Sequence, residues 1–156
     1  MKARRRARAV VLQCLYELDY TDHHFSEAFR NRLAEQPLAA KSQHFSYALG
    51  QAVAEFRAVL DEIIQELAPE WPIDQIATID RNILRIAVYE LLFERDTPPK
   101  VAINEAVELA KKFGSDSSPR FVNGVLGSLA SRQQNRYYLE LQERILNRAE
   151  STSGGA

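Results

Sequence analysis

The sequence has little of what covalent or metal cross-links require. It contains one cysteine, Cys14, so no disulfide can form within the chain, and a cytoplasmic setting is expected. Its histidines lack partners at metal-ligand spacing, because His23 and His24 are adjacent and His44 stands alone. We therefore expect no metal site, no cofactor and a fold that depends on its apolar core.

Long apolar runs are also absent. No stretch reaches the roughly 20 apolar residues that a membrane-spanning helix needs. The basic N-terminus is not followed by the uninterrupted apolar segment of a targeting peptide, because Gln13, Glu17 and Asp19 interrupt it. Membrane association is therefore not expected.

Glycine is scarce, with six residues, and the alternation typical of strands is rare, so the sequence predicts an all-α fold. At 156 residues the chain is long enough for one domain that buries about two thirds of its unfolded surface. Trp71, between two prolines, is expected to fill an edge of the core. Ser118 is expected to cap a helix, and Gly124 and Gly127 to allow close packing. The first expected helix begins at the N-terminal basic cluster. A short helix follows Ser26 and ends before Pro37. The later helices span about 42–67, 74–94 with a break near Thr78, and 101–113, and the last one starts after the capping Ser118 and has apolar residues as far as Leu129.

Positive charge is concentrated at the N-terminus. Among 20 basic and 21 acidic residues, the first eight positions hold Lys2, Arg4, Arg5, Arg6 and Arg8 and no acid. Apolar residues then recur at helical spacing, so these cations open a helix, where each opposes the helix dipole by about 0.3–1 kcal/mol. Helix stability therefore does not account for them. They form either a solvated basic terminus or a phosphate-binding site made of guanidinium and backbone N–H groups.

A loop near the C-terminal third combines cations, small polar groups and aromatic rings, a mixture that suits single-stranded RNA. Phe113 and Phe121 are alternatively core anchors, and Asp116 would repel phosphate. Tyr16 should lie off the apolar face of the first helix, as an exposed contact for a base or a partner. The candidate loop residues are Lys112, Ser117, Arg120 and Phe121.

No catalytic constellation is present. Acidic pairs such as Asp61-Glu62 are typical of a solvated helix face, and the serines lack a nucleophile-elbow context. A phosphate-binding glycine-rich loop is missing too. The sequence therefore favours a binding protein over an enzyme.

Five segments resemble a known family. ARRRAR at 3–8, Leu15-Tyr16, LRIAVYEL at 84–91, KVAINEAVELAK at 100–111 and FVNGVL at 121–126 are similar in order and spacing to the NusB family of bacterial transcription antitermination factors. The resemblance covers about residues 3–20 and 79–129. It implies a compact bundle of about seven helices in two subdomains, over residues 1–132. A polar extension, 133–156, would follow as a short helix and then a disordered end.

The resemblance also implies a function. Family members pair with the ribosomal protein NusE, bind the single-stranded boxA element of nascent RNA, and help the RNA polymerase antitermination complex transcribe ribosomal RNA operons. By position, Arg4, Arg5, Arg6 and Arg8 match the arginine-rich RNA-binding motif. Tyr16 and the segment 117–121 match further parts of the RNA surface, and Asp80 with Arg81 matches part of the NusE surface.

Two residues depart from the family pattern. Ser117 stands where the family often has an acid, which puts that contact in doubt, and Pro119 should stiffen the entry to the following helix. Two other functions remain as alternatives: a helical protein-interaction module, or a fragment of an RNA methyltransferase with a NusB-like domain, against which the length argues. Family members include monomers and homodimers, so the sequence leaves the oligomeric state open.

Overall fold

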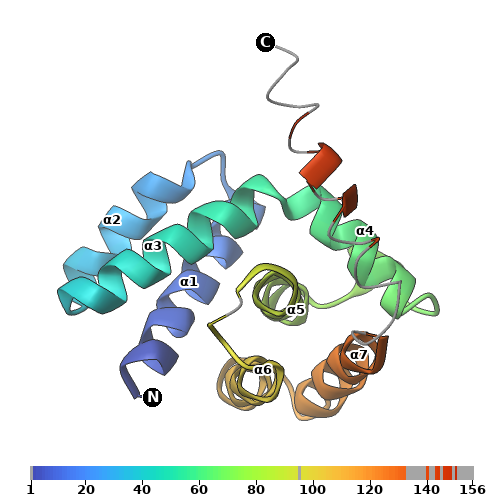
Figure 1. Cartoon of the computed structure of the whole chain (residues 1–156). Helices are drawn as coiled ribbons and strands as arrows, with labels where there is room; N and C mark the ends of the chain where they lie inside the picture. The colour runs from blue at the N-terminus through green and yellow to red at the C-terminus, as the bar shows by residue number, and fades with distance from the viewer. Residues whose placement is uncertain are drawn as a thin grey trace. The chain divides into compact units, whose positions relative to one another are not determined.

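The computed structural model describes residues 2–94, 96–132 and, further on, 140, 143, 144, 146–148 and 150. From Lys2 to Arg132 the described residues form seven α-helices and one short 3-10 helix, in two compact units, 1–55 and 56–156 (Figure 1). The predicted all-α fold of about seven helices in two subdomains is confirmed. The predicted extension, 133–156, lies mostly outside the described residues, and its boundary stays a prediction.

The first unit contains three helices, α1 (Lys2–Tyr20), α2 (Phe25–Glu35) and α3 (Ala40–Glu55), and α1 packs against both others. The predicted apolar face of α1 is buried. Cys14 lies fully inside, and desolvation raises its pKa to about 12, so the thiol stays protonated. The other buried apolar residues of α1 are Ala7, Ala9, Val10, Val11, Leu12 and Leu15.

Close approach of α2 and α3 depends on Gly50. A Cβ atom built on Gly50 would overlap the ring of Phe25, which starts α2. That ring also lies 5.6 Å from the ring of Phe29 and 5.9 Å from that of Tyr47, so an aromatic cluster fills the contact. The missing side chain of Gly50 is therefore what makes room for the cluster.

The second unit contains α4 (Arg57–Leu67), a 3-10 helix η1 (Ile73–Gln75), α5 (Thr78–Phe93), α6 (Pro99–Phe113) and α7 (Ser118–Arg132). Helix α5 packs against α4, α6 and α7. Its apolar surface extends beyond one stripe, as expected for a central helix. The buried apolar residues of α5 are Ile83, Leu84, Ile86, Ala87, Val88, Leu91 and Leu92.

An ion pair between a buried arginine and a partly buried aspartate joins α4 to α5. Arg85 donates from Nε to Oδ1 of Asp61 at 2.7 Å and from Nη2 to Oδ2 at 2.8 Å. Its Nη1 donates to Oδ1 of Asn82 at 2.9 Å. This bidentate geometry compensates the guanidinium for its lost hydration.

The predicted single helix over 42–67 is wrong. The chain leaves helical geometry at Phe56, with φ −94° and ψ 14°, and α3 and α4 are separate helices. The ring of Phe56 lies 6.3 Å from the rings of both Tyr89 and Phe93 on α5. Apolar spacing continues across the break, so periodicity does not reveal it.

The prediction that Gly124 and Gly127 allow close packing of a neighbouring helix is wrong. A Cβ atom built on either residue meets nothing within 4 Å. None of the helices in the described residues is long and apolar enough to cross a membrane.

Gly50→Ala should destabilise the protein, because the new methyl group must displace the Phe25 ring. We expect a loss of about 1–3 kcal/mol in the free energy of unfolding, measured by urea denaturation followed by circular dichroism. Gly127→Ala is the matched control and should gain up to about 1 kcal/mol, because alanine favours an exposed helix. Equal stability of the two variants would contradict the close contact.

Candidate nucleic-acid interface

The predicted basic cluster occupies the first two turns of α1. The side chains of Lys2, Arg4, Arg5 and Arg6 are exposed, and the first turn of the helix contains no acidic residue. The N–H groups at a helix start have no intrahelical acceptor, and the helix dipole adds positive potential there. Such a helix start is suited to an anion, and the phosphate site that the sequence predicts here stays a prediction.

Arg8 differs from the other cations, because only 4% of its surface is exposed. Its Cζ lies 5.3 Å from the ring centroid of Phe45 on α3, and the Cζ of Arg4 lies 4.0 Å from the same ring. Phe45 therefore supports Arg4 through a cation–π contact. The sequence did not reveal this role of Phe45, because no local pattern pairs α1 with α3.

Tyr16 lies on α1 and is 39% exposed, so its predicted place off the apolar face is confirmed. Its ring lies 5.0 Å from that of Tyr20, tilted by 49°. A hydrogen bond to Tyr20 raises the pKa of Tyr16. Sequence reasoning missed Tyr20, although its four-residue spacing from Tyr16 was a usable signal.

A set of serine hydroxyl groups organises the loop between α6 and α7. The N–H of Ser115 donates to Oγ of Ser118 at 2.9 Å. The Oγ of Ser115 lies 3.1 Å from that hydroxyl oxygen and 3.2 Å from Oγ of Ser117. Ser118 is buried and bonds back to the loop, so it does not act as the predicted cap of α7. A Cβ on Gly114 would lie 2.9 Å from the carbonyl oxygen of Ala110, which favours glycine at this turn.

The remaining predicted loop residues surround these serines in sequence. Lys112 and Arg120 are exposed, and Nζ of Lys112 lies 5.4 Å from the ring centroid of Phe113. Phe121 is half-buried, and its ring lies 6.1 Å from that of Trp71 at an angle of 75°. Phe121 therefore packs against Trp71 while part of its side chain stays accessible, so it is neither a fully buried core residue nor a fully exposed ring.

Asp80 and Arg81 lie at the start of α5. Asp80 is only 8% exposed. Its Oδ1 atom and the Nε atom of Arg81 are buried and have no hydrogen-bond partner. Arg81 also donates from Nη1 to the carbonyl oxygen of Ile73 at 3.1 Å, which ties α5 to η1. A buried polar atom without a partner costs about 1–3 kcal/mol, so this pair is a candidate for a partner-dependent role.

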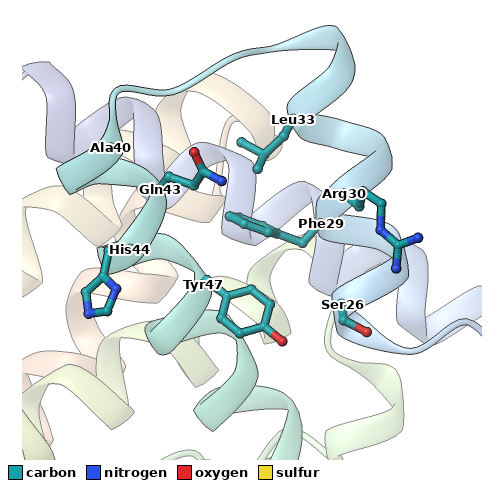
Figure 2. A pocket seen from close by; sticks show the side chains of 8 residues that line it. All are labelled: Ser26, Phe29, Arg30, Leu33, Ala40, Gln43, His44 and Tyr47. Atoms are coloured by element: carbon teal, nitrogen blue, oxygen red, sulfur yellow. The ribbon is translucent and has the colours of Figure 1, made fainter.

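The hollow shown in Figure 2 lies between α2 and α3 and has a volume of about 630 Å³. The rings of Phe29 and Tyr47 project into the space between the two helices. None of the predicted site residues lines the hollow. Its lining residues are Ser26, Phe29, Arg30, Leu33, Ala40, Gln43, His44 and Tyr47.

The predicted RNA-binding residues fall into two sets, one in each unit, and the predicted partner contacts Asp80 and Arg81 stand apart from both at the start of α5. Lys2, Arg4, Arg5, Arg6, Arg8 and Tyr16 share α1, whereas Lys112, Ser117, Arg120 and Phe121 surround one loop. Within the described part of the chain, no three His, Cys, Asp or Glu side chains cluster as metal ligands. The roles of all these residues stay predictions.

Comparisons with known proteins give a consistent result. Residues 5–131 match the model of the NusB family. The chain is 48% identical to the transcription antitermination protein NusB of Dehalococcoides mccartyi strain CBDB1, over 82% of this chain and 90% of that protein. It is 42% identical to NusB of Bacillus subtilis strain 168, over 82% of this chain and 95% of that protein.

Solved structures show the same fold. NusB of T. maritima is 32% identical, with a TM-score of 0.78 over 88% of this chain and 96% of that one. A second relative comes from a crystal structure of the antitermination factors NusB and NusE in complex with double-stranded RNA. It is 27% identical, with a TM-score of 0.75 over 82% of this chain and 96% of that one.

Ser118→Ala should loosen the loop between α6 and α7, because the Ser115 N–H loses its acceptor. We expect a loss of about 1–2 kcal/mol in the free energy of unfolding and faster amide hydrogen exchange at Ser115. The control Ser131→Ala removes a hydroxyl that donates to the carbonyl oxygen of Ser128 on the exposed side of the same helix. It should change stability by less than about 0.5 kcal/mol. Unchanged exchange at Ser115 in Ser118→Ala would show that this hydrogen bond does not hold the loop.

Proposed function

Because this chain belongs to the NusB family of transcription antitermination proteins, we propose that it binds single-stranded boxA RNA together with a NusE partner, within the antitermination complex of RNA polymerase. The observation that carries the proposal is the group of exposed cations at the start of α1, one of which, Arg4, lies over the ring of Phe45. The related NusB was crystallised with NusE and RNA, which supports both classes of partner. The relatives reported above are antitermination proteins, which favours this function over that of a methyltransferase.

Within the first unit, Lys2, Arg4, Arg5 and Arg6 bind phosphate groups. Arg4 is the best-placed of them, because its guanidinium rests on an aromatic ring and loses less side-chain freedom on binding. We assign Arg8 to holding Phe45 in place beneath Arg4, since its own side chain is buried.

Tyr16 and the loop of the second unit supply contacts to RNA bases and sugars. Lys112 and Arg120 offer charge, Ser117 offers a hydroxyl that can reach a sugar or phosphate, and Phe121 offers part of a ring. Stacking requires unpaired bases, whereas the RNA in the related complex is double-stranded. Single-stranded and duplex boxA must therefore be compared directly.

The start of α5 is the proposed contact for NusE. Asp80 and Arg81 keep one unpartnered buried polar atom each, so a partner that draws these side chains outward recovers the cost of leaving them unsatisfied. Asp80 also lies in the first turn of α5, where the positive end of the helix dipole favours an acidic side chain.

The double variant Arg4→Ala/Arg5→Ala should flatten the dependence of log affinity on log salt concentration by about 1.4. Each phosphate contact to a single strand contributes about 0.7 to this slope. The measurement is fluorescence anisotropy of labelled boxA RNA, with NusE present, over a series of salt concentrations. Arg30→Ala/Lys41→Ala removes two exposed cations from α2 and α3 and is charge-matched. Equal slopes for the two double variants would refute a specific phosphate site at the arginines.

Asp80→Asn should weaken NusE binding by about tenfold, as expected for losing one hydrogen bond to a charged group. The isolated protein should lose less than about 1 kcal/mol, because only the dipole interaction of the carboxylate is removed. Calorimetric titration with purified NusE, without RNA, measures the binding. Asp74→Asn, an exposed carboxylate on η1, is the control and should bind as the wild type does. Equal binding by both variants would exclude Asp80 from the partner surface.

A further inference from the structure

Trp71 is the one tryptophan of the chain, and 52% of its surface is exposed. The prediction that it fills an edge of the core is therefore wrong. A tryptophan combines a large apolar ring with a polar N–H, and exposed tryptophans are enriched where proteins bind partners. Trp71 lies in a proline-flanked loop between α4 and η1, and this position alone does not explain why its ring is exposed.

The backbone that carries Trp71 is held firmly. The side-chain Nε2 of Gln65 donates to the carbonyl oxygen of Trp71 at 2.7 Å, and its Oε1 accepts from the N–H of Ile73 at 2.8 Å. The N–H of Trp71 donates to the carbonyl oxygen of Ala68 at 3.1 Å, and Arg81 holds the carbonyl oxygen of Ile73. The ring is thus presented to solvent from a fixed loop, so little conformational freedom is lost when something binds to it.

Trp71 adjoins the predicted RNA surface of the second unit. Its ring meets that of Phe121 edge to face, at 6.1 Å and 75°, and Arg120 beside Phe121 is exposed. The nearest acid in sequence, Glu70, is exposed and would repel phosphate. Trp71 therefore offers a ring for stacking, whereas the positive charge comes from Arg120 beside Phe121.

We propose that Trp71 is a stacking platform for an unpaired RNA base and extends the Phe121 surface. This inference rests on the proposed function, because it requires that the protein binds RNA. An aromatic side chain stacks on any base through its π face, so Trp71 adds affinity for unpaired nucleotides without choosing their sequence. It also favours single-stranded over duplex RNA, since bases within a helix stack on each other.

The single tryptophan makes the test direct. The wild-type protein is titrated with single-stranded boxA RNA in the presence of a NusE partner whose own sequence contains no tryptophan. The fluorescence of Trp71 should be quenched at the same RNA concentrations at which the anisotropy of the labelled RNA reports binding. Trp71→Ala should weaken RNA binding by roughly 5- to 150-fold, the range for loss of one aromatic stack, and Trp71→Phe should retain most of the affinity. Tyr47→Ala, at a 40% exposed aromatic in the first unit, is the matched control and should bind as the wild type does.

A series of RNAs with one abasic nucleotide identifies the stacked base. When the abasic nucleotide is the one that Trp71 contacts, wild type and Trp71→Ala should bind with equal affinity, because the stack is already lost without its base. At every other nucleotide the variant should stay weaker than the wild type by the same factor. Thermal unfolding of the variants confirms that they fold.

The other outcomes distinguish failure of the stacking role from failure of the proposed RNA binding. If anisotropy shows RNA binding while Trp71 emission stays constant and Trp71→Ala binds equally well, the stacking role is refuted and the proposed function stands. If Trp71→Ala binds RNA normally but loses NusE in the absence of RNA, Trp71 contacts the protein partner instead. If the wild type binds no RNA by either signal, both proposals fall.

Discussion

The burial of α5 is the constraint on which the second unit depends. This helix packs against three others, yet it contains buried polar residues that need partners. Arg85 finds them in Asp61 and Asn82, and this pair fixes α4 to α5. Removing Asp61 would break two short hydrogen bonds to the buried guanidinium of Arg85. The apolar core therefore requires a specific polar contact, which in turn positions α4.

The same helix positions the surface features at its own start. Arg81 bonds to the backbone of Ile73, and Gln65 on α4 holds the loop that contains Trp71. Trp71 then meets Phe121, at the first turn of α7. The proposed partner contact and the proposed RNA contacts of this unit are thus connected through hydrogen bonds and one ring contact, and both depend on the packing of α5.

In the first unit the corresponding support is aromatic. Phe45 lies beneath Arg4 and beside Arg8, so an apolar ring orders cations that would otherwise repel one another. The ordering matters for binding, because a long exposed side chain loses conformational freedom when it holds a phosphate. A helix start provides the remaining donors from its backbone.

Sequence reasoning succeeded where local pattern decides the outcome. The apolar spacing of α1 predicted which face is buried and that Tyr16 is exposed, and the prolines predicted where helices begin and end. It failed at Phe56 and Ser118. In each case a residue compatible with the predicted element makes a different contact, with an aromatic group of α5 or with the preceding loop.

The sequence by itself determined the all-helical class, the concentration of cations at the start of α1 and, through its segment similarities, the family. These follow from properties that are local along the chain: hydrophobic period, charge and motif order. Only the tertiary structure decided that Phe45 supports Arg4, that Arg8 is buried and that Trp71 is exposed beside Phe121. Each of these depends on residues from different helices and loops, because burial is a property of what packs against a side chain rather than of the side chain itself.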